Sequence, residues 1–265
     1  MAPQKSHPVT GLLSNSDRPF QLHRLAVPTS LEAVLEYLWV VTWQLPPGER
    51  FISENLPHPC PHWVYDPERS GLFGPVKGRF NKELTGNCWV IGARVKIGVM
   101  TELTGDSMNT WVDQVGDFNQ IFPWNTRELD LAMAGAKNWE EGTKLYQELL
   151  DQGPWPMNLS PDIALVQKIE ADIRNRNDWF QVQQVCGAYD LSERQLERLF
   201  KKYVGLTPKW TLRLNRLQQL TDRVVADEPI DWADLAVQLG YFDQAHCLRD
   251  FKNMTGKSPG DYRPS

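Results

Sequence analysis

The sequence lacks long hydrophobic runs. No uncharged apolar stretch approaches the ~18 residues that a membrane-spanning helix requires, and the run from Leu38 to Val41 ends at the polar Thr42. We therefore expect no membrane segment and no membrane partner. The N-terminal residues up to Ser16 also have no apolar core of the kind that signal peptides carry, which predicts that the protein is not secreted.

Cysteine is scarce and scattered. The four cysteines are Cys60, Cys88, Cys186 and Cys247, and no two have the C-x-x-C spacing of zinc and redox sites. This distribution excludes a disulfide scaffold and a zinc finger. It is typical of a reduced interior, so we expect a cytoplasmic protein.

Catalytic motifs are also missing. The glycine-containing segment Gly92–Gly98 has neither the lysine nor the spacing of a phosphate-binding loop. We find no nucleophile motif and no pair of carboxylates placed for acid–base work. The sequence predicts a protein that is not an enzyme, with no cofactor and no metal.

The charge is distributed unevenly along the chain. The 28 basic and 33 acidic residues give a net charge of -5. Residues 158–265 contain six Lys and nine Arg against eleven Asp and four Glu, which balance, so the whole deficit lies in residues 1–157. A neutral domain can bind DNA if its cations cluster on one face, so this balance does not exclude a nucleic-acid partner.

The first ~120 residues have the pattern of β-structure. Short apolar runs such as Tyr37–Trp43 and Cys88–Ile97 alternate with turn signals such as Pro46-Pro47-Gly48. We expect an α+β protein whose N-terminal part is a barrel-like or sandwich-like domain. Eight of the eleven tryptophans precede residue 158. They either fill a small core or line a ligand cavity, and the sequence leaves both interpretations open.

A helical segment follows. Residues Thr126–Leu150 read as helix, with two apolar stripes separated by Gly142, and could pack on the barrel or on a second subunit as a homodimer contact. The stop at Gly153-Pro154-Trp155-Pro156 predicts a domain boundary. We therefore divide the chain into a β-rich domain (1–120), a helical extension and linker (121–157) and an all-helical domain (158–265).

The last 80 residues contain an internal repeat. Five residues recur at an offset of 51 positions: Arg198, Phe200, Lys201, Gly205 and Pro208 match Arg249, Phe251, Lys252, Gly256 and Pro259. This recurrence indicates one structural unit used twice.

Each copy has the local signals of two helices joined by a tight turn. In the first, Ser192 and Gln195 form a capping box and Gly205 ends the helix. Asp190 occupies the turn position, where glycine would adopt the left-handed conformation most readily but Asp tolerates it. In the second, Asp231 and Asp243 cap the two helices around a turn at Gly240. This arrangement is a helix-turn-helix, whose second helix enters the major groove of DNA.

A linking helix is expected from Pro208 to Ala226. About 18 residues at ~1.5 Å per residue give a rod of roughly 27 Å. Two recognition helices on such a rod could address successive major grooves, which lie about 34 Å apart.

These segments resemble the AraC/XylS family of bacterial transcription regulators over about Pro161 to Pro264. The resemblance rests on Leu191-Ser192-x-Arg194-x-Leu196-x-Arg198-Leu199-Phe200, Gly205-x-x-Pro208, Leu235-Ala236-x-x-Leu239-Gly240-Tyr241, Asp243-Gln244-Ala245-His246, Arg249-Asp250-Phe251-Lys252 and Gly256-x-Ser258-Pro259-x-x-Tyr262-Arg263. The sequence departs from the family at Cys247, where Phe is usual, and at Asp190. The N-terminal part resembles, less closely, the β-barrel sensor half of such regulators. The resemblance implies a regulator with double-stranded operator DNA and RNA polymerase as partners and an unknown small-molecule effector at an N-terminal sensor domain (1–120).

The family's recognition helices indicate which residues touch DNA. Arginine can bind guanine with two hydrogen bonds, and glutamine can bind adenine in the same way. The expected base-reading residues are Arg194, Gln195, Arg198, Gln244, His246 and Arg249. The expected phosphate contacts are Ser192, Lys201, Lys202, Lys252 and Lys257. For any one of them, an ordinary solvated surface residue is the alternative.

One further cluster, His58-Pro59-Cys60-Pro61-His62, invites a different hypothesis. Alternating His, Cys and His could place three metal ligands on one strand face, which would make the N-terminal half a metal-dependent or redox sensor, or an enzyme. The two prolines favour an extended loop instead, no fourth ligand is evident, and a reactive Cys60 is the least supported alternative.

Overall fold

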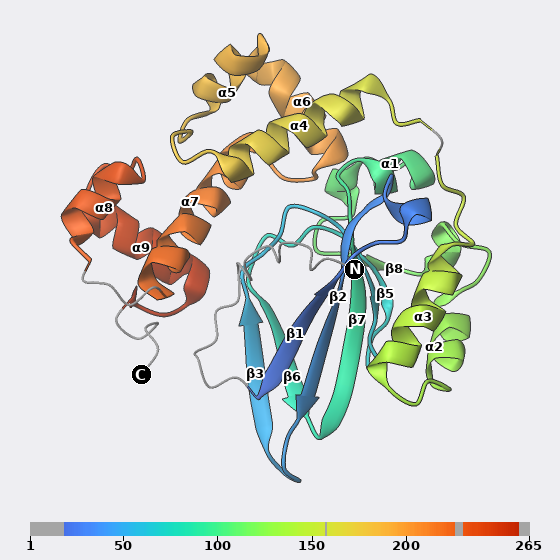
Figure 1. The fold of residues 1–265 in the computed structure, drawn as a ribbon. Helices are drawn as coiled ribbons and strands as arrows, with labels where there is room; N and C mark the ends of the chain where they lie inside the picture. The colour runs from blue at the N-terminus through green and yellow to red at the C-terminus, as the bar shows by residue number, and fades with distance from the viewer. Residues whose placement is uncertain (1–18, 157, 226–229, 260–265) are drawn as a thin grey trace.

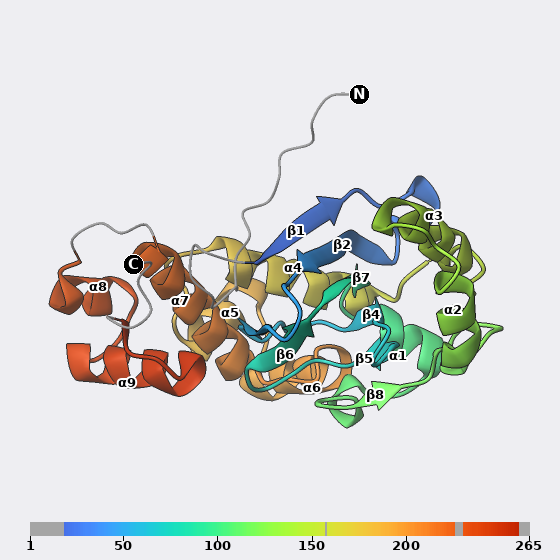
Figure 2. The ribbon, with the colours of Figure 1, turned by 90° about the horizontal axis from the view of Figure 1, so that it is seen from below.

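The protein is described by a computed structural model covering residues 19–156, 158–225 and 230–259 (Figure 1). It is an α+β protein with an antiparallel sheet domain followed by six helices. Figure 2 shows the last two helices, α8 (Trp232–Gln238) and α9 (Gln244–Thr255), at one end of the molecule. The helices α2 (Thr126–Met133) and α3 (Trp139–Leu150) lie at the other end.

The sheet domain contains a large and a small sheet. The large sheet has the strand order β1-β2-β7-β4-β5-β8, and β3 and β6 form the small one. The strands are β1 (Phe20–Leu25), β2 (Leu35–Gln44), β3 (Arg50–Asn55), β4 (His62–Tyr65), β5 (Gly71–Phe73), β6 (Phe80–Thr85), β7 (Asn87–Val95) and β8 (Val115–Gly116). No ladder joins the two sheets in the described part of the chain, so the domain is sandwich-like rather than a closed barrel.

The alternation of side chains along β2 explains the two cores of this domain. Leu38 and Val40 point to one face and pack in the main core beneath the helices. Trp39, Val41 and Trp43 point to the other face, toward the small sheet. A strand that is apolar on both faces must be covered on both sides, and the sheet domain provides both covers.

Short helices close the ends of the sheet. These are η1 (Thr29–Leu31), α1 (Val99–Thr104), η2 (Met108–Thr110) and η3 (Phe118–Gln120).

The prediction of one helix over Thr126–Leu150 is wrong, because α2 (Thr126–Met133) and α3 (Trp139–Leu150) are separate. Asn138 caps α3 by accepting a hydrogen bond from the Glu141 N–H, so a new helix begins there.

Gly142, which the sequence pattern suggested as the interruption, lies inside α3 and is buried. A Cβ on this residue would lie 2.3 Å from the Trp89 ring, so the glycine permits close packing of α3 on the sheet.

The C-terminal helices form two helix-turn-helix units. The helices are α4 (Pro161–Asn175), α5 (Val182–Tyr189), α6 (Glu193–Tyr203), α7 (Pro208–Val225), α8 (Trp232–Gln238) and α9 (Gln244–Thr255). The helices α5 and α6 form the first unit, α8 and α9 form the second, and α7 connects them. The capping box at Ser192, the left-handed Asp190 at φ 51° and the positive φ of Gly205 and Gly240 are confirmed.

The helix α7 contributes side chains to the cores of both helix-turn-helix units. Its 18 residues include Leu212, which packs in the core of the first unit, and Leu214 and Leu217, which pack in the core of the second. The same helix therefore holds both units. Ala226, the expected last residue of this helix, lies outside the described residues.

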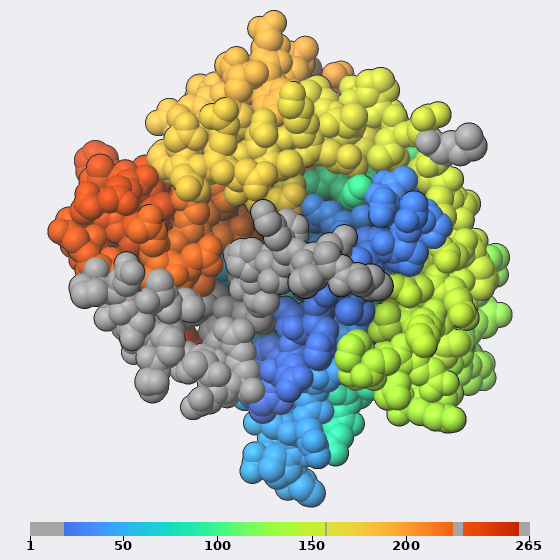
Figure 3. Space-filling view, in the orientation of Figure 1, coloured from blue at the N-terminus to red at the C-terminus, as the bar shows by residue number. Residues whose placement is uncertain are grey.

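The helical units also pack on the sheet domain. Cys60 and Ile97 contribute to the core of the first unit, and Leu56 contributes to the core of the second. Figure 3 shows the yellow surface of α4 resting on the blue and green surface of the sheet domain. Of the helices in the described ranges, none combines the length and the apolar character needed to cross a membrane.

Candidate nucleic-acid interface and effector pocket

The first recognition helix, α6, presents two arginines to solvent. Arg194 and Arg198 are exposed and lie four residues apart, so they share one face of the helix. The opposite face buries Leu196, Leu199 and Phe200 in the core of the first unit. The helix is therefore held firmly while its arginine face is open to a ligand.

Two other candidates on α6 already have local partners. Gln195 Oε1 accepts hydrogen bonds from the Ser192 N–H at 2.8 Å and from its hydroxyl at 2.7 Å. Ser192 Oγ in turn accepts from the Gln195 N–H at 3.3 Å. Because pairing with adenine would use the same amide oxygen, Gln195 would have to open the capping box to read a base. Its role as a base reader stays a prediction.

The second recognition helix, α9, resembles the first in its exposure pattern. Asp243 caps it by accepting from the His246 N–H at 2.6 Å, and Gln244, His246 and Arg249 are exposed. The His246 ring meets the Tyr241 ring edge-on, with centroids 5.2 Å apart. The ring is thereby oriented at the start of the helix.

A buried carboxylate that the sequence analysis missed fixes α9 against α7. Asp250 accepts hydrogen bonds from Arg213 Nε at 2.7 Å and from the Tyr241 hydroxyl at 3.0 Å, and it forms an ion pair with the same guanidinium. Burial, together with the Asp250 charge, raises the pKa of Tyr241, so its hydroxyl stays protonated and donates. The sequence signals were its place in the motif Arg249-Asp250-Phe251-Lys252 and its position on the inner face of a helix.

The candidate phosphate contacts differ in their surroundings. Lys201 and Lys252 are exposed. The Lys202 ammonium lies 4.7 Å from the Tyr203 ring centroid. Lys257 forms an ion pair with Glu54 of the sheet domain at 3.1 Å, so this lysine already has an acidic partner.

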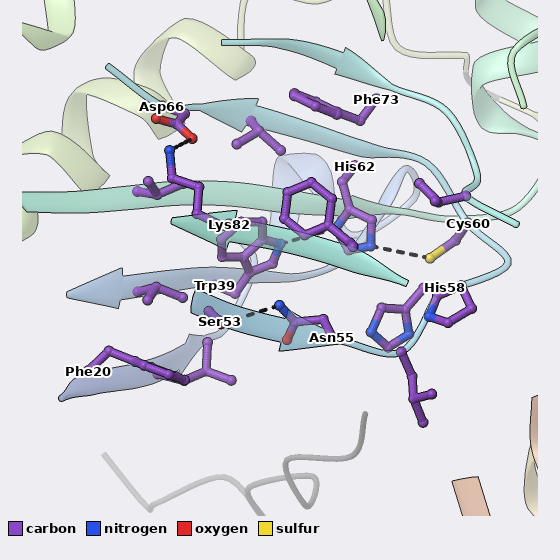
Figure 4. Close-up of a pocket in the computed structure, with 18 of the residues that line it drawn as sticks. Phe20, Trp39, Ser53, Asn55, His58, Cys60, His62, Asp66, Phe73 and Lys82 are labelled. Carbon is purple, nitrogen blue, oxygen red and sulfur yellow. Dashed lines mark hydrogen bonds and ion pairs between the residues drawn. The ribbon is translucent and has the colours of Figure 1, made fainter. Parts of the chain in front are cut away.

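A separate cavity of about 220 Å³ lies between the two sheets of the N-terminal domain (Figure 4). Its wall is mostly apolar and aromatic. Representative lining residues are Phe20, Leu22, Tyr37, Trp39, Val41, Trp43, Phe73 and Val90. The tryptophans of the N-terminal half serve both of the roles that the sequence left open. Trp39 and Trp43 line the cavity, and Trp63 is fully buried in the main core.

Two basic residues line this cavity, and both have protein neighbours. Lys82 forms ion pairs with Asp66 at 2.7 Å and with Glu68 at 2.6 Å, so its charge is balanced inside the protein. The Arg24 guanidinium lies 4.9 Å from the centre of the Tyr37 ring.

The His58-to-His62 segment forms one end of the cavity, between β3 and β4. Trp39 Nε1 donates to His62 Nδ1 at 3.1 Å, and His62 Nε2 lies 3.6 Å from Cys60 Sγ. Since Nδ1 accepts, the ring proton of neutral His62 is on Nε2, which faces the sulfur. Both ring nitrogens are thus engaged by protein atoms.

The protonation states in this segment are set by burial. Burial and the nearby Arg94 charge lower the pKa of His62 to about 3 and that of His58 well below its ordinary value. Burial raises the pKa of Cys60 to about 12, so the sulfur is a thiol and a poor nucleophile at neutral pH. The residues that the structure describes contain no group of three or more His, Cys, Asp or Glu placed to hold a metal.

Acidification should therefore destabilise the protein through His62. Its folded pKa is about 3 and its unfolded value is 6.5, so below pH 6.5 the unfolded chain takes up a proton that the folded chain refuses. The free energy of unfolding is expected to fall by about 1.4 kcal/mol for each pH unit below 6.5 from this group alone. Urea unfolding of wild type and His62→Asn between pH 7 and 4.5 measures the difference, and equal pH dependence in the two proteins would contradict it.

A buried charge cluster joins the sheet domain to α4. Arg94 on β7 forms an ion pair with Glu36 on β2, and Arg174 on α4 bonds Glu36 at 3.0 Å and Glu170 at 3.5 Å. Burial alone would raise the pKa of Glu36, but the two arginines hold it below its ordinary value, whereas burial raises the pKa of Glu170. Arg94 also lies 3.5 Å from His58 Nδ1, so the cluster borders the cavity.

Comparisons with known proteins match two separate parts of the chain. A helix-turn-helix domain family matches residues 185–265, and a domain of unknown function (DUF6597) matches residues 23–117. An uncharacterized HTH-type transcriptional regulator of Haemophilus influenzae is 30% identical over 90 residues, which are 34% of this chain and 30% of that protein. The HTH-type transcriptional regulator MtrA of Neisseria gonorrhoeae is 30% identical over 99 residues, which are 37% and 32% of the two chains.

The chain therefore spans about a third of the length of these relatives. Among solved structures, the C-terminal domain of AraT from Geobacillus stearothermophilus matches with 24% identity and a TM-score of 0.34, covering 40% of this chain and 85% of that one. ToxT from Vibrio cholerae O395 matches with 12% identity and a TM-score of 0.38, covering 92% and 96%. The C-terminal region of this chain, residues 185–265, is therefore an AraC-type helix-turn-helix domain.

Proposed function

We propose that the protein is a sequence-specific regulator of transcription that reads two successive major grooves of operator DNA with α6 and α9. The observation that carries this proposal is the matched pair of capped helices, each with a buried apolar face and an exposed face bearing Arg194 and Arg198 or Arg249. One rigid helix, α7, holds both units. A single chain could then contact two grooves without a partner subunit.

Base reading is assigned to Arg194, Arg198, Gln244, His246 and Arg249, with Gln195 reading a base only if its capping box opens. Phosphate contacts are assigned to Lys201, Lys202, Lys252 and Lys257. Ser192 contributes through its place at the start of α6, where the helix N-terminus favours an anion. A regulator of this kind acts in the cytoplasm together with RNA polymerase, and the division at residues 120 and 157 separates its sensing and DNA-binding parts.

Selection from random duplexes tests the proposal directly. The bound pool should converge on one site, and the log of the affinity should fall steeply and linearly with the log of the salt concentration. A pool that stays random at moderate salt would exclude sequence-specific binding.

The cavity between the sheets is the proposed effector site. Trp39 and Trp43 line it, so a bound small molecule should change the tryptophan fluorescence of the protein. We expect a Trp39→Phe variant to lose part of this change, whereas Trp210→Phe, in the C-terminal domain, should keep it. Absence of any response across a library of metabolites would count against an effector in this cavity.

A further inference from the structure

The two helix-turn-helix units begin their turns in the same way. A left-handed residue follows the first helix of each unit, Asp190 at φ 51° in one and Gly240 at φ 70° in the other. The next residue donates its N–H to a carbonyl five positions back, at 3.0 Å from Leu191 and at 2.9 Å from Tyr241. Leu191 and Tyr241 are therefore equivalent, and the side chain of each packs with the core of its own unit.

The second turn then contains one residue more than the first. Leu191 is followed directly by the helix cap Ser192, whereas Phe242 stands between Tyr241 and the cap Asp243. Phe242 therefore has no counterpart in the first unit. Its side chain is 91% exposed, so the packing of the second unit does not account for it.

The chain is anchored on both sides of Phe242. Tyr241 is buried, and its hydroxyl donates to Asp250 at 3.0 Å. On the other side, Asp243 accepts a hydrogen bond from the His246 N–H at 2.6 Å. A side chain on a backbone that is already ordered loses less conformational freedom when it meets a ligand.

Phe242 also lies at the end of α9 that faces DNA in a helix-turn-helix. Such motifs contact base edges with the first residues of the second helix, and α9 begins at Gln244, two positions after Phe242. Among the exposed large apolar side chains of the described ranges, only Phe242 adjoins the start of a recognition helix. The others are Ile52, Phe80, Leu131 and Val237.

The major groove offers an apolar side chain one apolar partner. Each base edge there presents hydrogen-bond donors or acceptors, and thymine alone adds a methyl group, on C5. The proposed base readers on α9 recognise bases through hydrogen bonds, which leave this methyl group unread. Packing a phenyl ring on it would remove apolar surface of both partners from water.

We propose that Phe242 is a specificity-determining residue that packs on the methyl group of a thymine in the major groove that α9 enters. The second half of the operator then prefers thymine at one position. The first unit, whose turn lacks this residue, imposes no equivalent preference. This inference rests on the proposed function, since it takes α9 to be a recognition helix.

Single substitutions of thymine by deoxyuridine in the selected duplex test the contact, because they remove only the methyl group. They are made in the half of the duplex whose protection depends on Arg249. At one position the wild-type protein should bind the uracil duplex about fourfold more weakly, the effect of burying one methyl group. Phe242→Ala should bind the thymine duplex at least about fourfold more weakly than wild type and should not distinguish thymine from uracil.

Two further variants serve as controls. Phe242→Leu keeps an apolar side chain and should retain part of the thymine preference. Leu131→Ala, at a position on α2 that is 67% exposed, should match the wild type on every duplex. Because the Phe242 ring is exposed, Phe242→Ala should unfold at the same urea concentration as wild type, which separates a loss of affinity from a loss of fold.

Three results would overturn the inference. The first is equal binding of thymine and uracil duplexes by the wild type at every position, and the second is a thymine preference that persists in Phe242→Ala. The third is unchanged duplex affinity in Phe242→Ala, which would assign the exposed ring to a protein partner. All three leave the proposed function standing, because the selected duplex is still bound. A pool that never converges is a different result, which rejects the proposed function and this inference together.

Discussion

Replacing Arg198 and Arg249 together with alanine is expected to abolish most of the preference of the protein for its operator. If each arginine reads a guanine, each loss should cost about 1–3 kcal/mol of binding free energy. The two residues lie on different recognition helices, so their costs should nearly add, to about 2–6 kcal/mol. Titrations of the selected duplex and of a scrambled duplex measure the change in the affinity ratio.

A matched control is available in the sheet-domain half. Arg127 on α2 is an exposed arginine outside both recognition helices, and Arg127→Ala should leave the affinity ratio unchanged. If the double variant lowers affinity for operator and scrambled duplex by the same factor, the two arginines contact phosphates rather than bases. If it lowers neither, the assignment of these helices to DNA is wrong.

Replacing Arg94 with leucine is expected to cost about 3–5 kcal/mol in the free energy of unfolding, because it breaks the ion pair of a buried arginine and leaves Arg174 to balance both Glu36 and Glu170. Arg94 is 6% exposed and is paired with Glu36, in contact with the cluster that includes Glu170 and Arg174. Urea denaturation followed by tryptophan fluorescence measures the change.

Two comparisons test the reason for this loss. Arg50→Ala, which removes an ion pair with Glu83 that is exposed on both sides, should change stability by no more than about 0.5 kcal/mol. The double variant Arg94→Leu/Glu36→Gln should recover part of the loss, because it removes one of the two carboxylates that Arg174 would otherwise balance alone. No recovery would mean that lost packing, rather than an unpaired charge, explains the effect.

The local signals of the helix-turn-helix units made them predictable from sequence. A capping box at Ser192, a cap at Asp243 and a C-terminal Gly205 each act within a few residues, so the sequence spacing alone defines the helix ends. The inner faces followed from helical spacing in the same way. The recurrence at 51 positions then indicated that the unit occurs twice.

Features that depend on contacts between distant segments were not predictable. Leu56 reads as an ordinary apolar residue at the end of a strand, and only the folded chain places it in the core with Phe251. The Glu36–Arg94–Arg174 cluster likewise joins residues up to 138 positions apart. Gly142 was expected to separate two apolar stripes of one helix, but it lies inside α3, where it permits close packing on Trp89.

The cavity between the sheets was predictable only in part. The richness in tryptophan suggested either a core or a binding site, and one strand, β2, serves both, since its two faces alternate. The His58-to-His62 cluster suggested metal chemistry from its residue types. The folded chain instead engages both nitrogens of His62 with Trp39 and Cys60.

Footprinting of the purified protein on its selected duplex tests the central claim most directly. The account predicts two protected patches on one face of the DNA, with major-groove centres about 10 base pairs apart, and loss of one patch in Arg198→Ala and of the other in Arg249→Ala. A single protected patch, or the same footprint in both variants, would contradict the reading of two successive grooves by one chain.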